Sequence, residues 1–89
     1  MANNTDRRNK EILMVWDYLR KERRHTADFC REFMDENYFA DEMYVYKIMK
    51  RAESLPDTFD PSKASLIYHL VMTNQYMDLV KYQPEEKEQ

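Results

Sequence analysis

The sequence of 89 residues contains no glycine, where ordinary usage of about 7% would give about six. Glycine supplies the positive φ of tight hairpins and the close backbone approach of phosphate-binding loops. Its absence argues against hairpin-rich folds and against glycine-rich nucleotide-binding folds. We therefore expect an all-α protein whose turns use Asn, Asp and Pro.

Cysteine is almost absent, and the single residue of this type, Cys30, excludes a disulfide within the chain. A structural zinc site usually needs four nitrogen or sulfur ligands. Only Cys30, His25 and His69 could supply them, and their spacing is not that of a ligand set. No pair of carboxylates falls in a pattern typical of acid–base catalysis. We predict no metal site, no cofactor, no catalytic residue and no enzyme activity.

Long apolar segments are missing as well. No stretch approaches the roughly 18 apolar residues of a membrane-spanning helix, and no targeting signal is recognisable. We expect a cytoplasmic protein with no membrane partner. With 43% hydrophobic and 13% aromatic residues, a chain of this length can form one domain with a small core.

Apolar residues that recur every three or four positions predict four helices in one domain. The predicted domain covers 9–82, with a loose N-terminus at 1–8 and a solvated tail at 83–89. The predicted helices span about 9–24, 26–37, 41–53 and 60–82. Thr26 and Asp41 are favourable N-caps, and Asp60 followed by Pro61 begins the last helix. Asn37 is expected to take a left-handed conformation where the second helix ends. The expected core residues of the first three helices are Ile12, Leu13, Val15, Trp16, Leu19, Phe29, either Cys30 or Met34, Phe33, Val45, Ile48, Met49 and Ala52.

The net charge of −3 conceals an uneven distribution. Cations concentrate at Arg20–Arg24, where the first predicted helix ends, and at Lys47, Lys50 and Arg51 in the third. The segment 32–46 carries five acids and no base. The first group of cations suits the negative end of a helix dipole, so phosphate contact is not needed to explain it.

The segment 38–52, YFADEMYVYKIMKRA, resembles the recognition-helix region of helix-turn-helix DNA-binding proteins. Residues 9–40, NKEILMVWDYLRKERRHTADFCREFMDENYFA, have the length and order of the two supporting helices and of the turn that follows, so the resemblance covers about residues 9–53. These residues look like short transposase-related proteins of bacterial phages and mobile elements. The turn lacks the usual glycine, and the third helix begins with the acids Asp41 and Glu42.

The resemblance implies a third helix in the major groove of double-stranded DNA and a regulatory or accessory role in a phage or mobile element. The DNA-binding residues, with the basic end of the first helix added for phosphate contact, would be Tyr46, Lys47, Lys50, Arg51, Arg20, Arg23 and Arg24.

A second hypothesis requires no nucleic acid. The acidic segment, with Asp35 and Glu36, could bind a basic partner protein, so that the chain acts as an adaptor or inhibitor. Seven tyrosines and seven methionines favour an interface, because these residues are enriched there and cannot all lie in a small core.

The fourth predicted helix would be about 30 Å long, which is more than a three-helix core can cover. Its two apolar stripes predict a homodimer. The inward stripe is Leu66, Leu70, Met77 and Val80, and the stripe facing the second copy is Ile67, Tyr68, Val71 and Tyr76, with Asn74 fixing the register. In the alternative, the helix breaks near Asn74 and a fifth short helix folds back, which hides both stripes in a monomer.

Overall fold

The computed structural model describes residues 4–81, and all regular elements in this range are helical, which confirms the all-α prediction. The α-helices are α1 (Asn4–Asp17), α2 (Ala27–Tyr38), α3 (Glu42–Lys50) and α4 (Leu66–Met72). A π-helical segment, η1 (Tyr18–Glu22), extends α1, and the 3₁₀ turns are η2 (Ala52–Ser54), η3 (Pro61–Lys63) and η4 (Met77–Leu79). No helix within residues 4–81 is long and apolar enough to cross a membrane.

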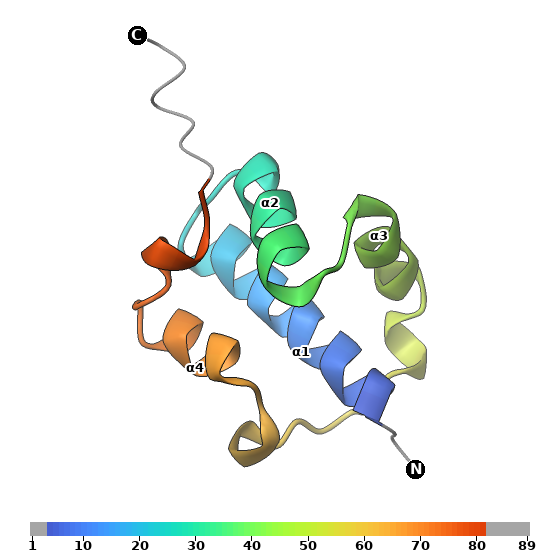
Figure 1. Ribbon diagram of the computed structural model, residues 1–89. Coiled ribbons are helices and arrows are strands. Elements are labelled where there is room, and N and C mark those ends of the chain that lie inside the picture. Colours follow the sequence, from blue (N-terminus) through green and yellow to red (C-terminus); the bar gives the residue numbers. More distant parts are fainter. Residues whose placement is uncertain (1–3, 82–89) are drawn as a thin grey trace, which may run out of the picture.

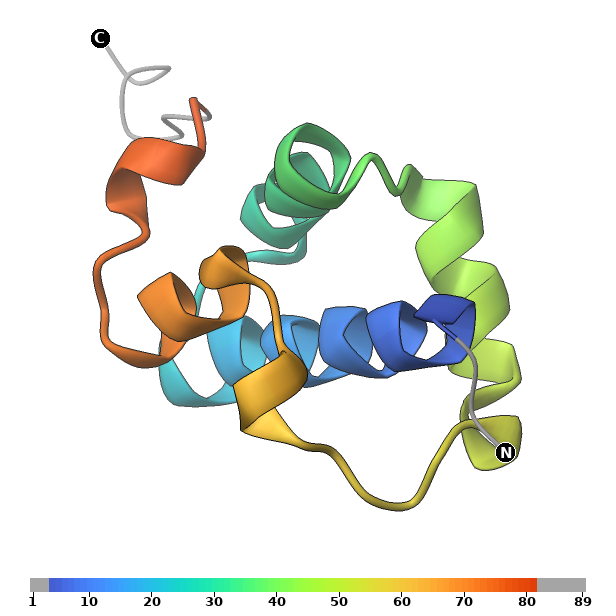
Figure 2. The same cartoon turned by 60° about the horizontal axis from the view of Figure 1, so that its bottom comes forward.

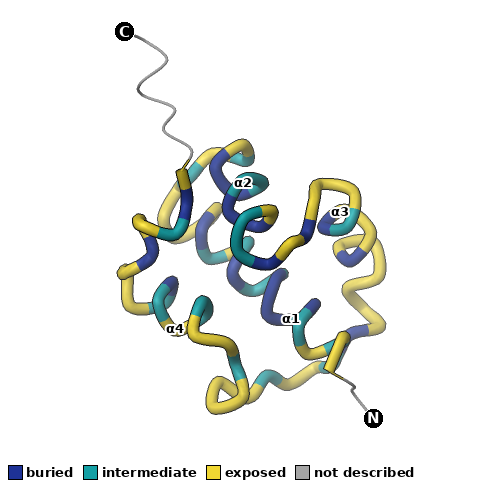
Figure 3. The backbone as a smooth tube through the Cα atoms, in the orientation of Figure 1, coloured by how far each residue is buried: buried dark blue, intermediate teal, exposed yellow. Residues whose placement is uncertain are grey.

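Helix α1 is the central element, since it contacts α2, α3 and α4 (Figure 1). The buried residues of these elements lie on the faces that they turn toward one another (Figure 3). The core contains Ile12, Val15, Leu19, Phe29, Cys30, Phe33, Met34, Tyr38, Ala40, Val45, Ile48, Val71, Tyr76 and Val80. Both Cys30 and Met34 are buried, while the predicted core residues Leu13 and Trp16 are half-buried at its edge.

Helices α2 and α3 begin where local signals place them. The Thr26 side chain accepts a hydrogen bond from the Phe29 amide at 3.1 Å, which confirms it as the N-cap of α2. Asp41 caps α3 in the same way, accepting from the Tyr44 amide at 2.9 Å. Each bond satisfies an amide that the first turn of a helix leaves unpaired.

The end of α2 differs from the prediction. Asn37 stays inside the helix, and its side-chain amide donates to the carbonyls of Phe33 and Leu79. Phe39 takes the left-handed conformation instead, with φ of 55°, and its side chain is 88% exposed. The Asn37 side chain thus joins α2 to η4, and the turn falls two residues later, at Phe39.

The N-terminal part of α1 was predicted to be loose up to residue 8, but the helix begins at Asn4. Arg8 explains this order, because its guanidinium donates to the Tyr38 carbonyl and lies 5.5 Å from the centre of the Tyr44 ring. The first turns of α1 are therefore anchored to both α2 and α3. Residues 1–3 lie outside the described range.

The continuous helix predicted for 60–82 is wrong. Asp60 does cap a helical turn, accepting from the Ser62 amide at 3.0 Å, but that turn ends at Lys63. Ser65 then caps α4, which ends at Met72, and Asn74 reverses the chain with φ of 62°. Of the alternative, the break near Asn74 and a short turn after it, η4, are observed. The exposure of Leu66 and Met77 shows that the stripes are not fully hidden. The predicted tail at 83–89 lies outside the described residues.

This break also removes the predicted homodimer face. Val71 and Tyr76 are 0% and 2% exposed in the core of a single chain, and Ile67 and Tyr68 are half-buried against it. Leu66, which was expected to face inward, is 72% exposed. Once the chain reverses at Asn74, residues on one helical stripe no longer share a face, and Val71 and Tyr76 are buried within one chain rather than available to a second copy. Of the predicted inward stripe, Met77 is exposed, Leu70 half-buried and Val80 buried.

Two buried polar residues of α1, which the sequence did not indicate, connect the halves of the chain. Asn9 accepts a hydrogen bond from the Tyr44 hydroxyl at 2.7 Å. Glu11 is 5% exposed and accepts from the Tyr38 hydroxyl and from the amide and hydroxyl of Ser65. Burial, together with the hydrogen bond to Glu11, raises the pKa of Tyr38. Glu11 therefore holds the N-terminus of α4 and the C-terminus of α2 on α1.

Candidate functional site

An apolar groove of about 490 Å³ lies between α1 and α3. Its lining residues are Trp16, Arg31, Glu42, Met43, Val45, Tyr46 and Met49. Met43, Tyr46 and Met49 recur every third residue of α3 and are 64%, 55% and 37% exposed. Large apolar side chains therefore remain in contact with solvent along one side of this helix.

The sequence prediction missed this groove because it assigned Met49 and Ala52 to the core. Both residues are exposed, since α3 ends at Lys50 and only Val45 and Ile48 of this helix are buried. The signal that could have revealed the groove is a methionine or tyrosine at every third position beside the buried stripe. Half-buried Trp16 forms the opposite wall.

Basic side chains border the groove along α3. Lys47, Lys50 and Arg51 are exposed, and none of them has a carboxylate within ion-pair distance among residues 4–81. The Lys50 ammonium lies 5.0 Å from the centre of the Tyr46 ring. Lys47 follows Met43 by four residues, so these two side chains are neighbours on the helix surface. The groove therefore has a positively charged margin.

The other cations predicted to bind DNA lie elsewhere. Arg20, Arg23 and Arg24 are at the C-terminal end of η1 and in the turn after it, whereas the basic end of α3 lies beside the N-terminal end of α1 (Figures 1 and 2). Arg20 donates to the His25 carbonyl at 2.8 Å, and Arg23 donates to the Tyr76 hydroxyl at 3.4 Å. The predicted DNA-binding residues thus form two separate groups, one of which holds a turn in place.

The acidic segment is also divided. Asp35 and Glu36 lie on α2 with Glu32, and a hydrogen bond between Glu36 and Glu32 raises the pKa of Glu32, with partial burial and the neighbouring acids adding to the effect. Glu36 also accepts from the Lys81 amide at 3.3 Å. Glu42 instead lines the groove, and Asp41 caps α3. The two predicted acidic partner residues therefore lie on α2, and neither of them lines the groove.

His25 belongs to a polar contact that fixes the C-terminal segment on α2. Its ring stacks on Phe29 with centroids 3.9 Å apart, and its Nε2 lies 2.6 Å from the Tyr76 hydroxyl. The Tyr76 hydroxyl oxygen accepts a hydrogen bond from Arg23, so the hydroxyl can donate its own proton to Nε2 of a neutral His25 ring. Burial lowers the pKa of His25, and the charge of Arg23 lowers it further.

This contact predicts a stability that falls on acidification. The folded-state pKa of His25 lies below its unfolded value of about 6.5, so the stabilisation is complete above that pH and is lost as the pH falls. We expect the melting temperature to drop between about pH 7.5 and pH 5.5, and the drop to shrink in His25→Gln. His69→Gln, at the other histidine and on an exposed position, should keep the wild-type drop. An equal drop in His25→Gln would show that another group is responsible.

Cys30 does not provide a reactive thiol, because burial raises its pKa to about 12. Within residues 4–81 no group of three or more His, Cys, Asp or Glu side chains could hold a metal ion.

No protein-family model, curated protein or solved structure matches the chain. Its function must be inferred from the geometry described above.

Proposed function

We propose that the chain is a protein-interaction module whose groove between α1 and α3 binds an amphipathic helix of a partner protein. The observation that carries this proposal is the exposure of Met43, Tyr46 and Met49 beside Trp16. Contiguous exposed apolar side chains on a small domain commonly mark a binding site. An adaptor or inhibitor is the class of function that such a module would serve.

The shape of the groove suits a short helical segment. From Met43 to Met49 the wall extends about 9 Å at 1.5 Å per residue, so two turns of an apolar helix can lie along it. A volume of about 490 Å³ is within the range of well-formed binding pockets. Methionine side chains are flexible and polarisable, which lets the wall adapt to anchors of different shape.

The charges around the groove indicate the chemistry of the partner. Lys47 and Lys50 border the groove toward the C-terminal end of α3, while Glu42 lines it at the N-terminal end. A complementary helix would carry acids next to its apolar anchors at one end and a cation at the other. This pattern would also fix the direction in which the helix binds.

DNA binding is the second candidate function. Only Phe39, Ala40 and Asp41 separate α2 from α3, which is the spacing of a helix-turn-helix motif, and the exposed cations of α3 could contact phosphates. The chain would then act as a regulatory or accessory protein of a phage or mobile element. The groove hypothesis is preferred because Met43 interrupts the outward face of α3 and Glu42 begins that helix.

The groove can be tested with displayed peptides of about 15 residues, a length at which isolated helices begin to form. We expect selection on the protein to enrich apolar residues at helical spacing flanked by acids. Enriched peptides should shift the fluorescence of Trp16, the only tryptophan in the chain. Met43→Asp should weaken binding about tenfold or more, since burying a large apolar side chain contributes about 1.5–3 kcal/mol. Met77→Asp, at an exposed methionine on η4 away from the groove, is the matched control.

A titration with mixed-sequence duplex DNA separates the two candidates. Binding that weakens steeply with salt, with a slope of about −0.9 per phosphate contact, and disappears in Lys47→Glu/Lys50→Glu/Arg51→Glu would favour DNA. No enriched peptide and no DNA binding at low salt would reject both candidates.

A further inference from the structure

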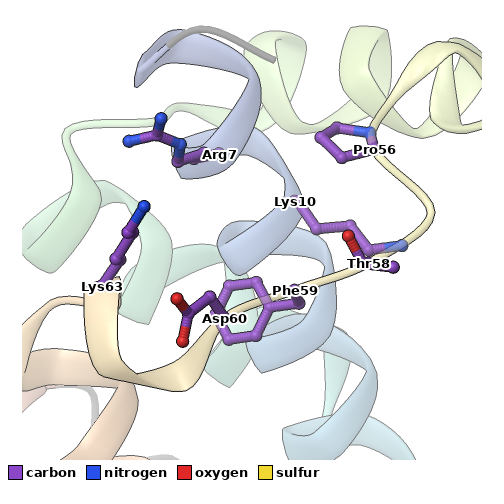
Figure 4. Close-up of a pocket in the computed structure, with 7 residues that line it drawn as sticks. All are labelled: Arg7, Lys10, Pro56, Thr58, Phe59, Asp60 and Lys63. Carbon is purple, nitrogen blue, oxygen red and sulfur yellow. The ribbon is translucent and has the colours of Figure 1, made fainter. Parts of the chain in front are cut away.

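A second cavity, of about 150 Å³, lies between the N-terminal half of α1 and the segment that connects α3 to α4 (Figure 4). Its lining residues are Arg7, Lys10, Pro56, Thr58, Phe59, Asp60 and Lys63. None of them lines the apolar groove, so the two sites are independent. We call this cavity the basic cleft.

Positive charge is in excess in the basic cleft. Three cations, Arg7, Lys10 and Lys63, face one carboxylate, and no ion pair links them among residues 4–81. Asp60 is already engaged, because it accepts from the amide and the hydroxyl of Ser62 at 3.0 and 2.8 Å. These hydrogen bonds are the main reason why the pKa of Asp60 is lowered, with Lys63 and Arg7 adding to the effect. Like charges gathered around one cavity repel one another, and a bound anion would relieve that repulsion.

The arrangement of the side chains favours a phosphate group. The guanidinium of Arg7 and the ammonium of Lys63 turn toward each other across the opening (Figure 4). Arginine offers a planar fork of donors that matches two phosphate oxygens, and lysine supplies a compact charge. Lys10 and the Thr58 hydroxyl add donors at the other end of the cleft.

The remaining wall is apolar and held in place. Phe59 packs against the Tyr68 ring with centroids 5.0 Å apart, and Pro56 lies nearby in the lining. This wall can cover the organic part of a phosphate ester, which a site for a free ion does not need. The volume of about 150 Å³ suits a small ligand.

We propose that the basic cleft binds a small phosphate monoester. Arg7 and Lys63 hold the phosphate dianion, and Phe59 contacts the organic group, which extends toward the end of the cleft where Lys10 and Thr58 lie.

Amide chemical-shift titrations by NMR at constant ionic strength test this site with phenyl phosphate, inorganic phosphate and sulfate. We expect saturable shifts at Thr58, Asp60 and Lys63 with phenyl phosphate at millimolar concentration. Arg7→Gln/Lys63→Gln should raise the Kd for phenyl phosphate at least tenfold. Both residues are exposed, so the double variant should fold, and Lys47→Gln/Lys50→Gln on α3 is the matched control with the same change of charge.

Each probe has a decisive outcome. Inorganic phosphate should bind several-fold more weakly than phenyl phosphate, and equal affinity would overturn the assignment of an ester. Sulfate binding as tight as that of both phosphates would reduce the cleft to a general anion surface and overturn the proposal. Unchanged binding in Arg7→Gln/Lys63→Gln would overturn it as well. The peptide groove is unaffected by any of these results.

Discussion

Val71→Glu is expected to unfold the domain. Val71 is 0% exposed and packs in the core of a single chain, so a carboxylate at this position would lose its hydration without gaining a partner. The penalty for burying one unpaired ion is several kcal/mol even after relaxation. Small domains have a total stability of about 5–15 kcal/mol, so this single change removes much of it.

The measurement is thermal unfolding followed by circular dichroism. In a domain of this size 1 kcal/mol corresponds to about 4–8 °C, so we expect the melting temperature of Val71→Glu to fall by tens of degrees or the transition to disappear. Leu66→Glu is the matched control in the same helix. Leu66 is 72% exposed, and its substitution should change stability by no more than about 0.5 kcal/mol.

The same variant tests the predicted homodimer. If Val71→Glu stayed folded with an unchanged melting temperature and halved the mass measured by light scattering, Val71 would lie at an interface between copies. That result would contradict its burial within one chain. Loss of the fold in Val71→Glu but not in Leu66→Glu would agree with it.

The N-caps of helices were predicted reliably from the sequence, because they depend on residues only a few positions apart. The caps formed by Thr26, Asp41 and Asp60 each depend on a hydrogen bond to an amide two or three positions later, so the sequence contains all that is needed. Most of the core of the first three helices was also predictable, because one continuous helix keeps an apolar stripe on one face. The exceptions were Met49 and Ala52, which are exposed, and Leu13 and Trp16, which are half-buried.

The fourth helix shows why periodicity alone was insufficient. A stripe drawn from Leu66 to Val80 assumes that the chain does not turn, yet Asn74 adopts the left-handed conformation that Asn tolerates better than most residues. Ser65, which the sequence prediction placed inside that helix, is the N-cap of a second start. Periodicity could be drawn through both residues, and only tertiary packing shows that the chain turns there.

The sites could be anticipated only in part. Tyr46, Lys47 and Lys50 were expected on an exposed face of the third helix, and they lie there. The groove beside Tyr46 depends on Trp16, which is thirty residues away in the sequence. The basic cleft likewise brings together Arg7 and Lys63, which are far apart in the chain. Such long-range juxtapositions have no local signature, because they are set by the way that α1 packs against the rest of the chain.

Glu11→Ala is expected to give the second large loss of stability. Glu11 accepts three hydrogen bonds, from the Tyr38 hydroxyl and from the amide and hydroxyl of Ser65. Alanine would leave the buried Tyr38 hydroxyl without an acceptor, which costs about 1–3 kcal/mol. It would also remove the two hydrogen bonds of the exposed Ser65, each with a net worth of about 0.5–1.5 kcal/mol. Removing a buried charge offsets part of this loss. We expect a net destabilisation of about 2–6 kcal/mol, measured by urea unfolding.

Matched variants separate the hydrogen bonds from the loss of side-chain volume. Glu11→Gln keeps the shape and one acceptor oxygen, which can still accept from the Ser65 amide, so its loss should be clearly smaller than that of Glu11→Ala. Tyr38→Phe removes one donor, and it should cost less in the Glu11→Ala background than in the wild type. The resulting coupling energy should lie between about 0.5 and 3 kcal/mol, as for other residues in direct contact.

Glu11→Ala should also loosen the molecule unevenly. Glu11 joins α1 to Ser65, the N-cap of α4, so its loss should free residues 61–80 before it affects the packing of α2 against α1. Hydrogen exchange can resolve such local opening residue by residue. Under native conditions we expect the amides of α4 to exchange much faster in Glu11→Ala than in the wild type. The amides of the buried part of α2 should exchange as slowly as they do in the wild type. Equal acceleration throughout residues 4–81 would instead mean that Glu11 stabilises the domain as a whole and that α4 does not depend on this carboxylate for its position.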